Sequence, residues 1–244
     1  MALLELASVT KTYGGIVAVD GASFQVEEGK ITALIGPNGA GKTTAFDTVC
    51  GVVRVDSGSI SLGGKDITNQ RPHKITKQGL GRTFQITREL GEMTVLENMA
   101  VTEVQNGIGS LRGRRISPEE REQAMDLLSF VGIDKLASQP AKRLSYGQRK
   151  LLEFASVLMA DPKLVLLDEP AGGVNPVLLD RLIDRIRDVN GRGTTFLIVE
   201  HNMDVVMSLS DSVVVMAHGQ VLIQDTPEIV RGNKRVLDAY LGEA

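Results

Sequence analysis

The sequence predicts an α/β fold in which a helical segment interrupts the sheet-forming part of the chain, and three observations support this class. Residues 3 to 35 have the alternating apolar pattern of strands and hairpins. Residues 94 to 158 carry apolar side chains at helical spacing, without convincing strand runs between them. The apolar runs "KLVLLDE" and "TTFLIVEH" then flank a helical pattern. Strand, helix, strand indicates a parallel sheet that is buried on both faces.

The first strands lead into a helix after Lys42 and a glycine-punctuated hairpin, "SGSISLGGKDI". Three helices follow in the patterns "TVLENMAVTEV", "EEREQAMDLLSFVG" and "YGQRKLLEFASVLM". Ser117, Pro118 and Glu120 suit the N-cap, the first residue and the capping-box acid of the middle helix.

The helix between the two apolar runs should begin at Asn175 and Pro176 and end at Gly191. Its apolar face holds Leu179, Leu182, Ile183 and Ile186. A hairpin, "SVVVMAHGQVLIQD", and a short helical tail from "TPEIVRG" to "AYLGEA" complete the predicted elements.

Composition excludes several classes of protein. With 244 residues and 42% hydrophobic residues, the chain can bury a sizeable core. A net charge of -3 and a pI near 5.7 give no electrostatic reason to expect nucleic acid as a partner. One cysteine, Cys50, and the lack of a signal-peptide pattern lead us to expect a cytosolic chain with Cys50 as a core residue. Its apolar runs are too short to span a bilayer, so a membrane role would need a partner.

The segment "LIGPNGAGKTT" fits the phosphate-loop pattern G-x-x-x-x-G-K-[ST] with Gly36, Gly41, Lys42 and Thr43. Glycines let backbone N–H groups point at phosphate oxygens, and the following helix adds its positive N-terminal dipole. Lys42 would reach the outer phosphates and Thr43 would ligate Mg²⁺. The alternative is a glycine-rich turn with a solvated lysine, but the flanking strand and helix favour phosphate binding.

Polar residues follow the two later apolar runs, where ligands collect in parallel α/β sheets. Because neighbours on a strand point to opposite sides, Asp168 is predicted to face Mg²⁺ and Glu169 the attacking water. His201 follows the next run and could contact a γ-phosphate or that water. A carboxylate pair that only caps a strand is the alternative. His73 and His218 have no such context and are expected to be structural.

The segment "RLSYGQRKLLEF" predicts a second anion-binding helix start, at Ser145 and Gly147. On local evidence alone, an ordinary N-cap followed by a glycine is the favoured explanation. Since the chain already has a phosphate loop, a second anion site would bind the phosphate of another molecule.

With these segments in this order, the chain resembles the ATP-binding subunits of ABC transporters over nearly its whole length. The matching segments are "GPNGAGKTT" (Walker A), "TFQ" (Q-loop), "LSYGQ" (signature), "LVLLDEP" (Walker B), "AGGVNP" (D-loop) and "EH" (switch histidine). The resemblance implies a P-loop NTPase with a RecA-like core, an antiparallel β subdomain and an inserted helical subdomain. One cassette of 1–244 is implied, with the core at 1–88 and 159–225, the insertion at 89–158 and a tail at 226–244.

The resemblance also implies the roles of individual residues. Gln85 would sense Mg²⁺ and water, and Tyr13 would stack on adenine, although an aromatic residue at a strand end packs as often as it stacks. Glu169 and His201 would be further catalytic groups. The other residues of the implied site form four sets. These are ATP-binding Tyr13, Gly36, Pro37, Asn38, Gly39, Ala40, Gly41, Lys42, Thr43 and Thr44; signature Ser145, Tyr146, Gly147 and Gln148; D-loop Asn175; and the metal ligands Thr43, Gln85 and Asp168.

Two departures from the family pattern are Tyr146, at a usual glycine, and Asn175, at a usual aspartate. The segments "RTFQ", "MTVLENM" and "AYLGEA" resemble the branched-chain amino-acid uptake subset. The resemblance implies two cassettes that sandwich ATP, membrane permease subunits docked near Gln85, an indirectly linked solute-binding protein, and a position on the inner face of the plasma membrane.

Other functions stay open at this point. They are a cassette for urea, amides or another solute, a lipid or lipopolysaccharide exporter cassette, a non-transport ABC ATPase and a phosphoryl transferase. Neither tandem cassettes nor an acceptor-substrate domain is evident, which disfavours the last two. The basic stretch "LRGRR" at 111–115 has no interleaved aromatic residues and is expected to be a solvated loop.

Overall fold

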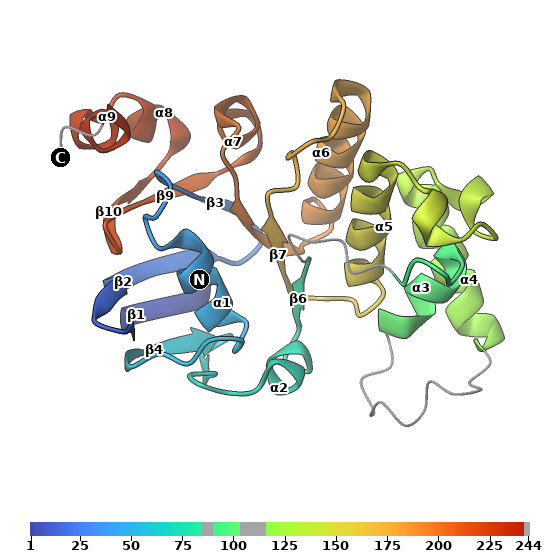
Figure 1. Ribbon diagram of the computed structural model, residues 1–244, viewed down its shortest axis with the longest axis horizontal. Coiled ribbons are helices and arrows are strands. Elements are labelled where there is room, and N and C mark those ends of the chain that lie inside the picture. Colours follow the sequence, from blue (N-terminus) through green and yellow to red (C-terminus); the bar gives the residue numbers. More distant parts are fainter. Residues whose placement is uncertain (84–89, 103–115, 242–244) are drawn as a thin grey trace.

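Two sheets form the frame of the molecule (Figure 1), which is a computed structural model that describes residues 1–83, 90–102 and 116–241. The first sheet is antiparallel in the order β2-β1-β4-β5, with β1 at Ala2–Tyr13, β2 at Ile16–Glu27, β4 at Ser57–Leu62 and β5 at Lys65–Asp66. The second has the order β10-β9-β3-β8-β7-β6, with β3 at Ile31–Ile35, β6 at Leu80–Arg82, β7 at Leu164–Asp168, β8 at Thr195–Val199, β9 at Ser212–Ala217 and β10 at Gln220–Asp225. All its neighbours pair in parallel except β9 and β10.

The parallel strands are buried on both faces, as predicted. Along β7, Leu164 and Leu166 face the core shared with the antiparallel sheet, whereas Val165 and Leu167 face the helices. Helix α1, Lys42–Val49, lies in the first of these cores, where Phe46 is fully buried. Period-two alternation thus gives each strand one face for each layer.

The helices on the other face belong largely to the predicted helical segment. These are α3 at Val95–Thr102, α4 at Pro118–Val131, α5 at Tyr146–Leu158 and α6 at Pro176–Asn190, with short 3₁₀ turns at Asp134–Leu136 and Ala141–Arg143. Their apolar faces share one core with β7 and β8. In Figure 1, α5 and α6 stand beside the sheet and α3 and α4 lie beyond them.

The predicted helix starts are confirmed. Ser117 caps α4 by accepting from the N–H of Glu120, whose side chain accepts from the N–H of Ser117. Asn175 caps α6 by accepting from the N–H of Leu178. Gly191 is the C-cap of α6, as predicted, and its φ of -59° is right-handed.

Short elements that were not predicted include β6, α2 at Pro72–Thr76 and α7 at Met203–Leu209. Each has too few residues to show a period in the sequence. The predicted hairpins are present, and β9 and β10 are joined by His218 and Gly219, both with positive φ, as a two-residue turn requires. His218 therefore has a structural position.

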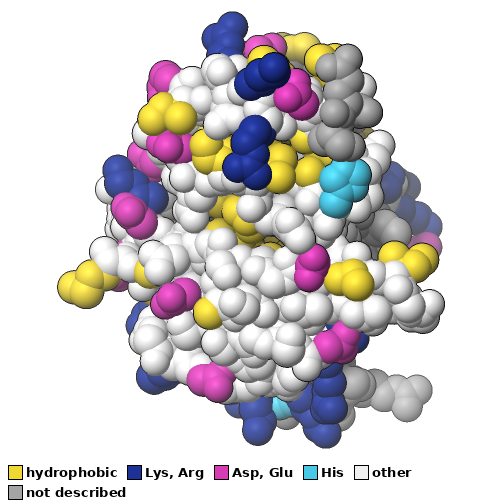
Figure 2. Space-filling view, turned by 90° about the vertical axis from the view of Figure 1, so that its left-hand side faces the viewer, with side chains coloured by type: hydrophobic (Ala, Val, Ile, Leu, Met, Phe, Trp, Pro, Cys, Tyr) yellow, Lys and Arg dark blue, Asp and Glu magenta, His cyan; other side chains and the backbone are white. Residues whose placement is uncertain are grey.

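Two short helices close the chain, α8 at Pro227–Arg231 and α9 at Lys234–Leu241. Val230 and Val236 pack on β3 and β9 and Ala239 is buried, while Leu237 and Leu241 stay exposed. Figure 2 shows the side of the molecule on which these two helices lie, and apolar side chains stand among charged ones in its upper part. In the parts of the chain that the structure describes, no helix has both the length and the apolar character needed to cross a bilayer.

Candidate functional site

Three neighbouring parallel strands carry the predicted catalytic groups at one edge of the sheet. The phosphate-loop sequence follows β3, His201 follows β8, Asp168 ends β7 and Glu169 comes directly after it. Because β8 lies between β3 and β7, His201 stands between the loop and the two carboxylates. Carboxyl ends of parallel strands are where open α/β sheets bind ligands. The topology therefore assembles one site from segments far apart in the sequence.

The loop at residues 36–41 is held against two other chain segments. Gly219 donates its N–H to the carbonyl of Ala40 at 3.1 Å, and it accepts from the N–H of Asp20 at 2.8 Å. Gly41, with φ of 94°, is the N-cap of α1, and a Cβ there would lie 2.2 Å from the carbonyl oxygen of Ala18. Glycine is required at this position by both backbone conformation and space. The β9–β10 turn, which the sequence did not link to this loop, braces it.

Lys42 is buried within that loop, with 6% of its surface exposed. Its Nζ donates to the carbonyl oxygens of Gly36 at 2.8 Å and Pro37 at 2.9 Å. Burial lowers the pKa of Lys42, and the charge of Glu169 acts in the opposite direction. An ammonium group has three N–H donors, so the two carbonyls fix its position without using its whole donor capacity. Asn38, Gly39 and Thr43 lie exposed around it.

Glu169 and His201 are in direct contact, with Oε1 2.9 Å from Nε2. Glu169 lies one residue beyond β7, and its φ of 48° is left-handed. The alternation of side chains along a strand therefore does not set the direction of the Glu169 side chain, and the prediction that it would is wrong. A non-glycine residue in this region is strained, and such strain often occurs at functional sites. The contact between the two side chains allows proton exchange or mutual orientation.

Asp168 is buried beside an arginine that the sequence did not indicate. Arg82, at the end of β6, contacts Asp47 on α1 at 2.6 Å and Asp168 at 3.7 Å. Burial raises the pKa of Asp168, and the Arg82 charge opposes this. Arg82 also lies over the Phe46 ring, 4.9 Å from its centroid. It thus links α1, β6 and β7, and only the sheet order could reveal this.

Residue types near Asp168 suit a magnesium ion shared with a nucleotide. The Asp168 carboxylate and the Thr43 hydroxyl are oxygen donors, and Thr43 lies in the first turn of α1. In the described part of the chain, no three His, Cys, Asp or Glu side chains form a group that could hold a metal alone. Nucleotide-bound Mg²⁺ commonly uses one or two carboxylates and phosphate oxygens, which this donor set permits.

The signature segment begins a helix in a different layer from the phosphate loop. Ser145 caps α5 by accepting from the N–H of Gln148, and Gln148 accepts from the N–H of Ser145. Helix α5 packs in the helical core, whereas α1 packs between the sheets. Figure 1 shows α1 and α5 in separate parts of the molecule. The fold therefore does not bring Ser145 into the site around Lys42.

The tyrosine at the second signature position lies against the segment before α6. A Cβ on Gly173, whose φ is 68°, would lie 3.1 Å from Tyr146 Cε1. A Cβ on Gly147 would lie 2.6 Å from Leu178 Cδ1. Small residues at both positions let α5 approach α6 while Tyr146 stays partly exposed. Asn175, which begins α6, completes this junction.

The other predicted residues divide into two groups. Tyr13 ends β1 beside the Gly14–Gly15 turn, 47% exposed, with the Lys11 Nζ 5.2 Å from its ring centroid. Strand β2, which leaves that turn, passes the loop at Ala18. Gln85 and the basic stretch 111–115 lie outside the described residues.

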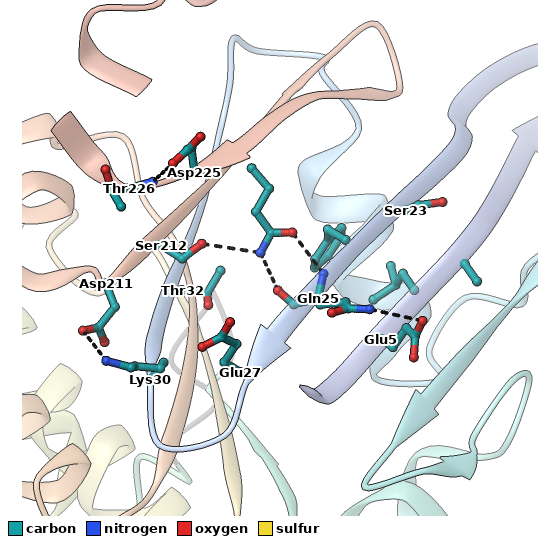
Figure 3. A pocket seen from close by; sticks show the side chains of 14 residues that line it. Glu5, Ser23, Gln25, Glu27, Lys30, Thr32, Asp211, Ser212, Asp225 and Thr226 are labelled. Atoms are coloured by element: carbon teal, nitrogen blue, oxygen red, sulfur yellow. Dashed lines mark hydrogen bonds and ion pairs between the residues drawn. The ribbon is translucent and has the colours of Figure 1, made fainter. Parts of the chain in front are cut away.

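A separate groove of about 740 Å³ lies at the opposite end of β3, between the two sheets. Figure 3 shows its polar lining. Gln224 bridges the sheets by donating to the Gln25 carbonyl at 2.6 Å, and Lys30 pairs with Asp211 at 3.3 Å. These groups bind each other across the groove, which contains none of the predicted catalytic residues.

Comparison with known proteins agrees with this geometry. The family model described as "ABC transporter" matches residues 19–172. The chain belongs to the ABC transporter family. The match spans both the phosphate loop and the Asp168–Glu169 segment.

Two relatives and one solved structure show how far the similarity of this ABC transporter chain extends. It is 42% identical to the probable branched-chain amino acid transport ATP-binding protein LivG of Archaeoglobus fulgidus, covering 99% of this chain and 96% of that protein. It is 40% identical to the high-affinity branched-chain amino acid transport ATP-binding protein BraF of Pseudomonas aeruginosa, covering 99% and 98%. The ADP conformation of MJ1267, an ATP-binding cassette of an ABC transporter, superposes with a TM-score of 0.91 at 35% identity, covering 99% of each chain.

The predicted fold class of this ABC transporter chain is thereby confirmed. The molecule has a mixed α/β fold with an antiparallel sheet and a helical part, and a solved ATP-binding cassette superposes on nearly all of it. The roles of its individual site residues stay predictions that rest on the geometry above.

Proposed function

We propose that this chain is the ATP-hydrolysing subunit of an importer for branched-chain or other hydrophobic amino acids. The observation that carries the ATPase part is the edge formed by β3, β8 and β7, which holds a phosphate loop beside the Glu169–His201 pair. The solute class is supported by the names of the two relatives, both branched-chain amino acid transport proteins.

ATP would bind to the exposed face of the loop. The N–H groups of residues 38–44 and the N-terminus of α1 favour the phosphates, and Lys42 is held where a fixed cation can bind the outer ones. Tyr13 would supply a face for adenine at the exposed end of β1. When bound, Mg²⁺ would neutralise phosphate charge, and Thr43, Asp168 and Gln85 are the residues proposed to hold it, Asp168 through water.

Glu169 would orient the attacking water and accept its proton. His201 Nε2 contacts Glu169 Oε1, so His201 would hold Glu169 in place. His201 would also donate toward the outer phosphate. Both side chains are partly exposed and lie beyond the strand ends, where a phosphate held by the loop would be reached.

A second cassette would complete each ATP site. Ser145 and Gly147 form a helix start that the fold keeps apart from its own phosphate loop. Packed head to tail, two chains would place the signature of one on the ATP of the other. Within each chain we propose a core at 1–88 and 159–225, a helical part at 89–158 and a tail at 226–244. Permease subunits would dock near the helical part, on the cytoplasmic face of the membrane.

Phosphate release tests the enzymatic part of this proposal. The purified chain should release phosphate from MgATP without any organic acceptor, which a phosphoryl transferase would require. Glu169→Gln should lower kcat by roughly 10² to 10⁴-fold while ATP binding persists, as expected when a general base is lost. The variant should accumulate as a closed dimer in size-exclusion chromatography with ATP. Normal hydrolysis by Glu169→Gln would show that the catalytic assignment is wrong.

A mixing experiment tests the shared site. Ser145→Arg chains and Lys42→Ala chains, each inactive alone, should together regain at most one composite site per dimer. Hydrolysis by a monomer at every dilution would contradict the sandwich.

Native co-purification tests the solute. The membrane and solute-binding chains that copurify should, with this cassette in proteoliposomes, take up labelled leucine, isoleucine or valine when ATP is present. Uptake of urea or amides alone, or export of lipid, would instead support another solute or an exporter.

A further inference from the structure

Glu200 is a buried carboxylate between the strand β8 and His201, and only 3% of its surface is exposed. The sequence gives no role to this residue, since it stands next to the histidine that the switch pattern identifies. A charged side chain is seldom buried unless it is paired or hydrogen-bonded. Its contacts therefore indicate what it is for.

Both oxygens of Glu200 accept hydrogen bonds from backbone N–H groups of two different loops. Oε1 accepts from Ala171 at 2.6 Å, in the loop after β7. Oε2 accepts from His201 at 2.8 Å and from Asn202 at 3.0 Å, in the loop after β8. Bonds to an ionised acceptor are short and strong. One carboxylate thus joins the two loops at the catalytic edge of the sheet.

The loop after β7 carries Glu169 in a strained conformation. Its φ is left-handed, and the N–H of Gly172 donates to the Glu169 carbonyl at 3.1 Å, which closes a turn that includes Ala171. The N–H of Glu169 donates to the Val199 carbonyl at 2.9 Å, one residue before Glu200. Strained backbone persists only where its surroundings hold it. The Ala171 bond to Glu200 supplies such a hold within the turn itself.

The loop after β8 carries His201, whose ring meets Glu169 at 2.9 Å. The distance between these two side chains depends on how the two loops are placed relative to each other, which we call their register. Glu200 contacts the backbone of His201 on one side and of Ala171, two residues after Glu169, on the other. Its carboxylate is therefore placed to set that register through hydrogen bonds to backbone N–H groups, not to the reacting side chains themselves.

We infer that Glu200 is a positioning residue for ATP hydrolysis, which holds Glu169 and His201 in register by clamping the backbones of their loops. This inference rests on the proposed function for its catalytic consequence. The clamp itself is a property of the two loops and is testable without ATP.

The substitution Glu200→Gln keeps the shape of the side chain but leaves one acceptor oxygen. That oxygen should turn toward the two donors of His201 and Asn202, so the amide NH₂ faces the N–H of Ala171 and that bond is lost. We expect kcat to fall at least about tenfold, as for a loss of catalytic alignment, while the dissociation constant for ATP stays within about threefold because these hydrogen bonds of Glu200 go to the loops after β7 and β8 and not to the phosphate loop.

The matched control is Glu228→Gln on the exposed surface of α8, which makes the same chemical change and should alter neither quantity. A second control is the Glu169→Gln background. Adding Glu200→Gln there should cause a smaller loss of kcat than in the wild-type chain, because Glu169 no longer acts as a base and only His201 is left to position.

Amide hydrogen exchange separates the clamp from the function. Protection of the Ala171 N–H should fall at least about tenfold in Glu200→Gln, with strand amides unchanged, since local opening differs from global unfolding. If the wild-type chain releases no phosphate, the proposed function fails, and unchanged Ala171 protection would separately refute the clamp. Lost protection with full kcat, a loss of ATP affinity as large as that of kcat, or additive loss in the Glu169→Gln background would each overturn the positioning role.

Discussion

Gly41 and Gly39 offer a comparison within one loop of how closely the backbone packs around the phosphate-binding segment. Both have left-handed backbone, with φ of 94° and 79°. A Cβ on Gly41 would lie 2.2 Å from the Ala18 carbonyl oxygen and 3.4 Å from Gly219 Cα, whereas a Cβ on Gly39 would meet nothing within 4 Å. Alanine at either position changes the backbone preference similarly, but only one variant forces neighbours apart.

Two effects set the loss of stability in these variants: the left-handed backbone and the contact with neighbouring atoms. Left-handed backbone costs a non-glycine residue about 1–2 kcal/mol, and both variants should lose this much stability. In Gly41→Ala, the Ala18 carbonyl must also retreat by roughly 1 Å to reach van der Waals distance. It belongs to β2, and overpacking against such a rigid neighbour costs about 1–3 kcal/mol more. The difference should therefore be about 2 kcal/mol, or about 6 °C in Tm for a chain of this length.

Urea denaturation followed by circular dichroism, without nucleotide, measures this difference directly. Gly41→Ala should unfold at a clearly lower urea concentration than Gly39→Ala, with similar m-values. Equal midpoints for the two variants would refute the reasoning, because they would show that β2 and the β9–β10 turn do not press on the loop.

Three further predictions concern other parts of the molecule. Lys42→Ala should weaken ATP binding about 10 to 100-fold in calorimetry, since a charge-assisted contact worth about 1.5–3 kcal/mol is lost, and unchanged affinity would contradict its role. Burial raises the pKa of the Cys50 thiol to about 12, against the effect of Arg82. The folded value thus exceeds the unfolded value, so stability should fall as the pH rises above 9.0 toward that value, and Cys50→Ala should remove this component of the pH dependence of urea midpoints. Gly173→Ala should destabilise the chain more when Tyr146 is present than in Tyr146→Gly, with a coupling energy of about 0.5–1 kcal/mol, and simple additivity would show that the ring does not press on Gly173.

Long elements with a clear period were predictable from the sequence. The apolar runs of β7 and β8 and the amphipathic α6 specify their own structure locally, because side-chain spacing must match the period of a strand or helix. Capping residues such as Ser117 and Asn175 act within three residues of their own position, so they too were visible. Short elements such as β6 exist only through pairing with a neighbour, and no local pattern marks them.

The chemistry of the site was partly predictable for the same reason. A phosphate loop requires glycines and a lysine at fixed positions relative to one another, so residues 36–44 could be recognised from the sequence alone. By contrast, Arg82 meets Asp168, and Glu200 meets Ala171, across strands that are distant in sequence. Nor could strand alternation foresee the left-handed conformation of Glu169, since that residue lies beyond the strand.

The sequence by itself therefore determined the fold class, the family and the residue types of the phosphate loop, because these depend on periodicity and on local offsets. Only the tertiary structure decided which groups meet. Sheet order places β8 between β3 and β7, so His201 reaches Glu169 and Glu200 joins two loops. It also places β9 beside β3, so Gly219 braces Ala40. Such contacts depend on hydrogen bonds and packing between distant segments, which come together only when the whole sheet has formed.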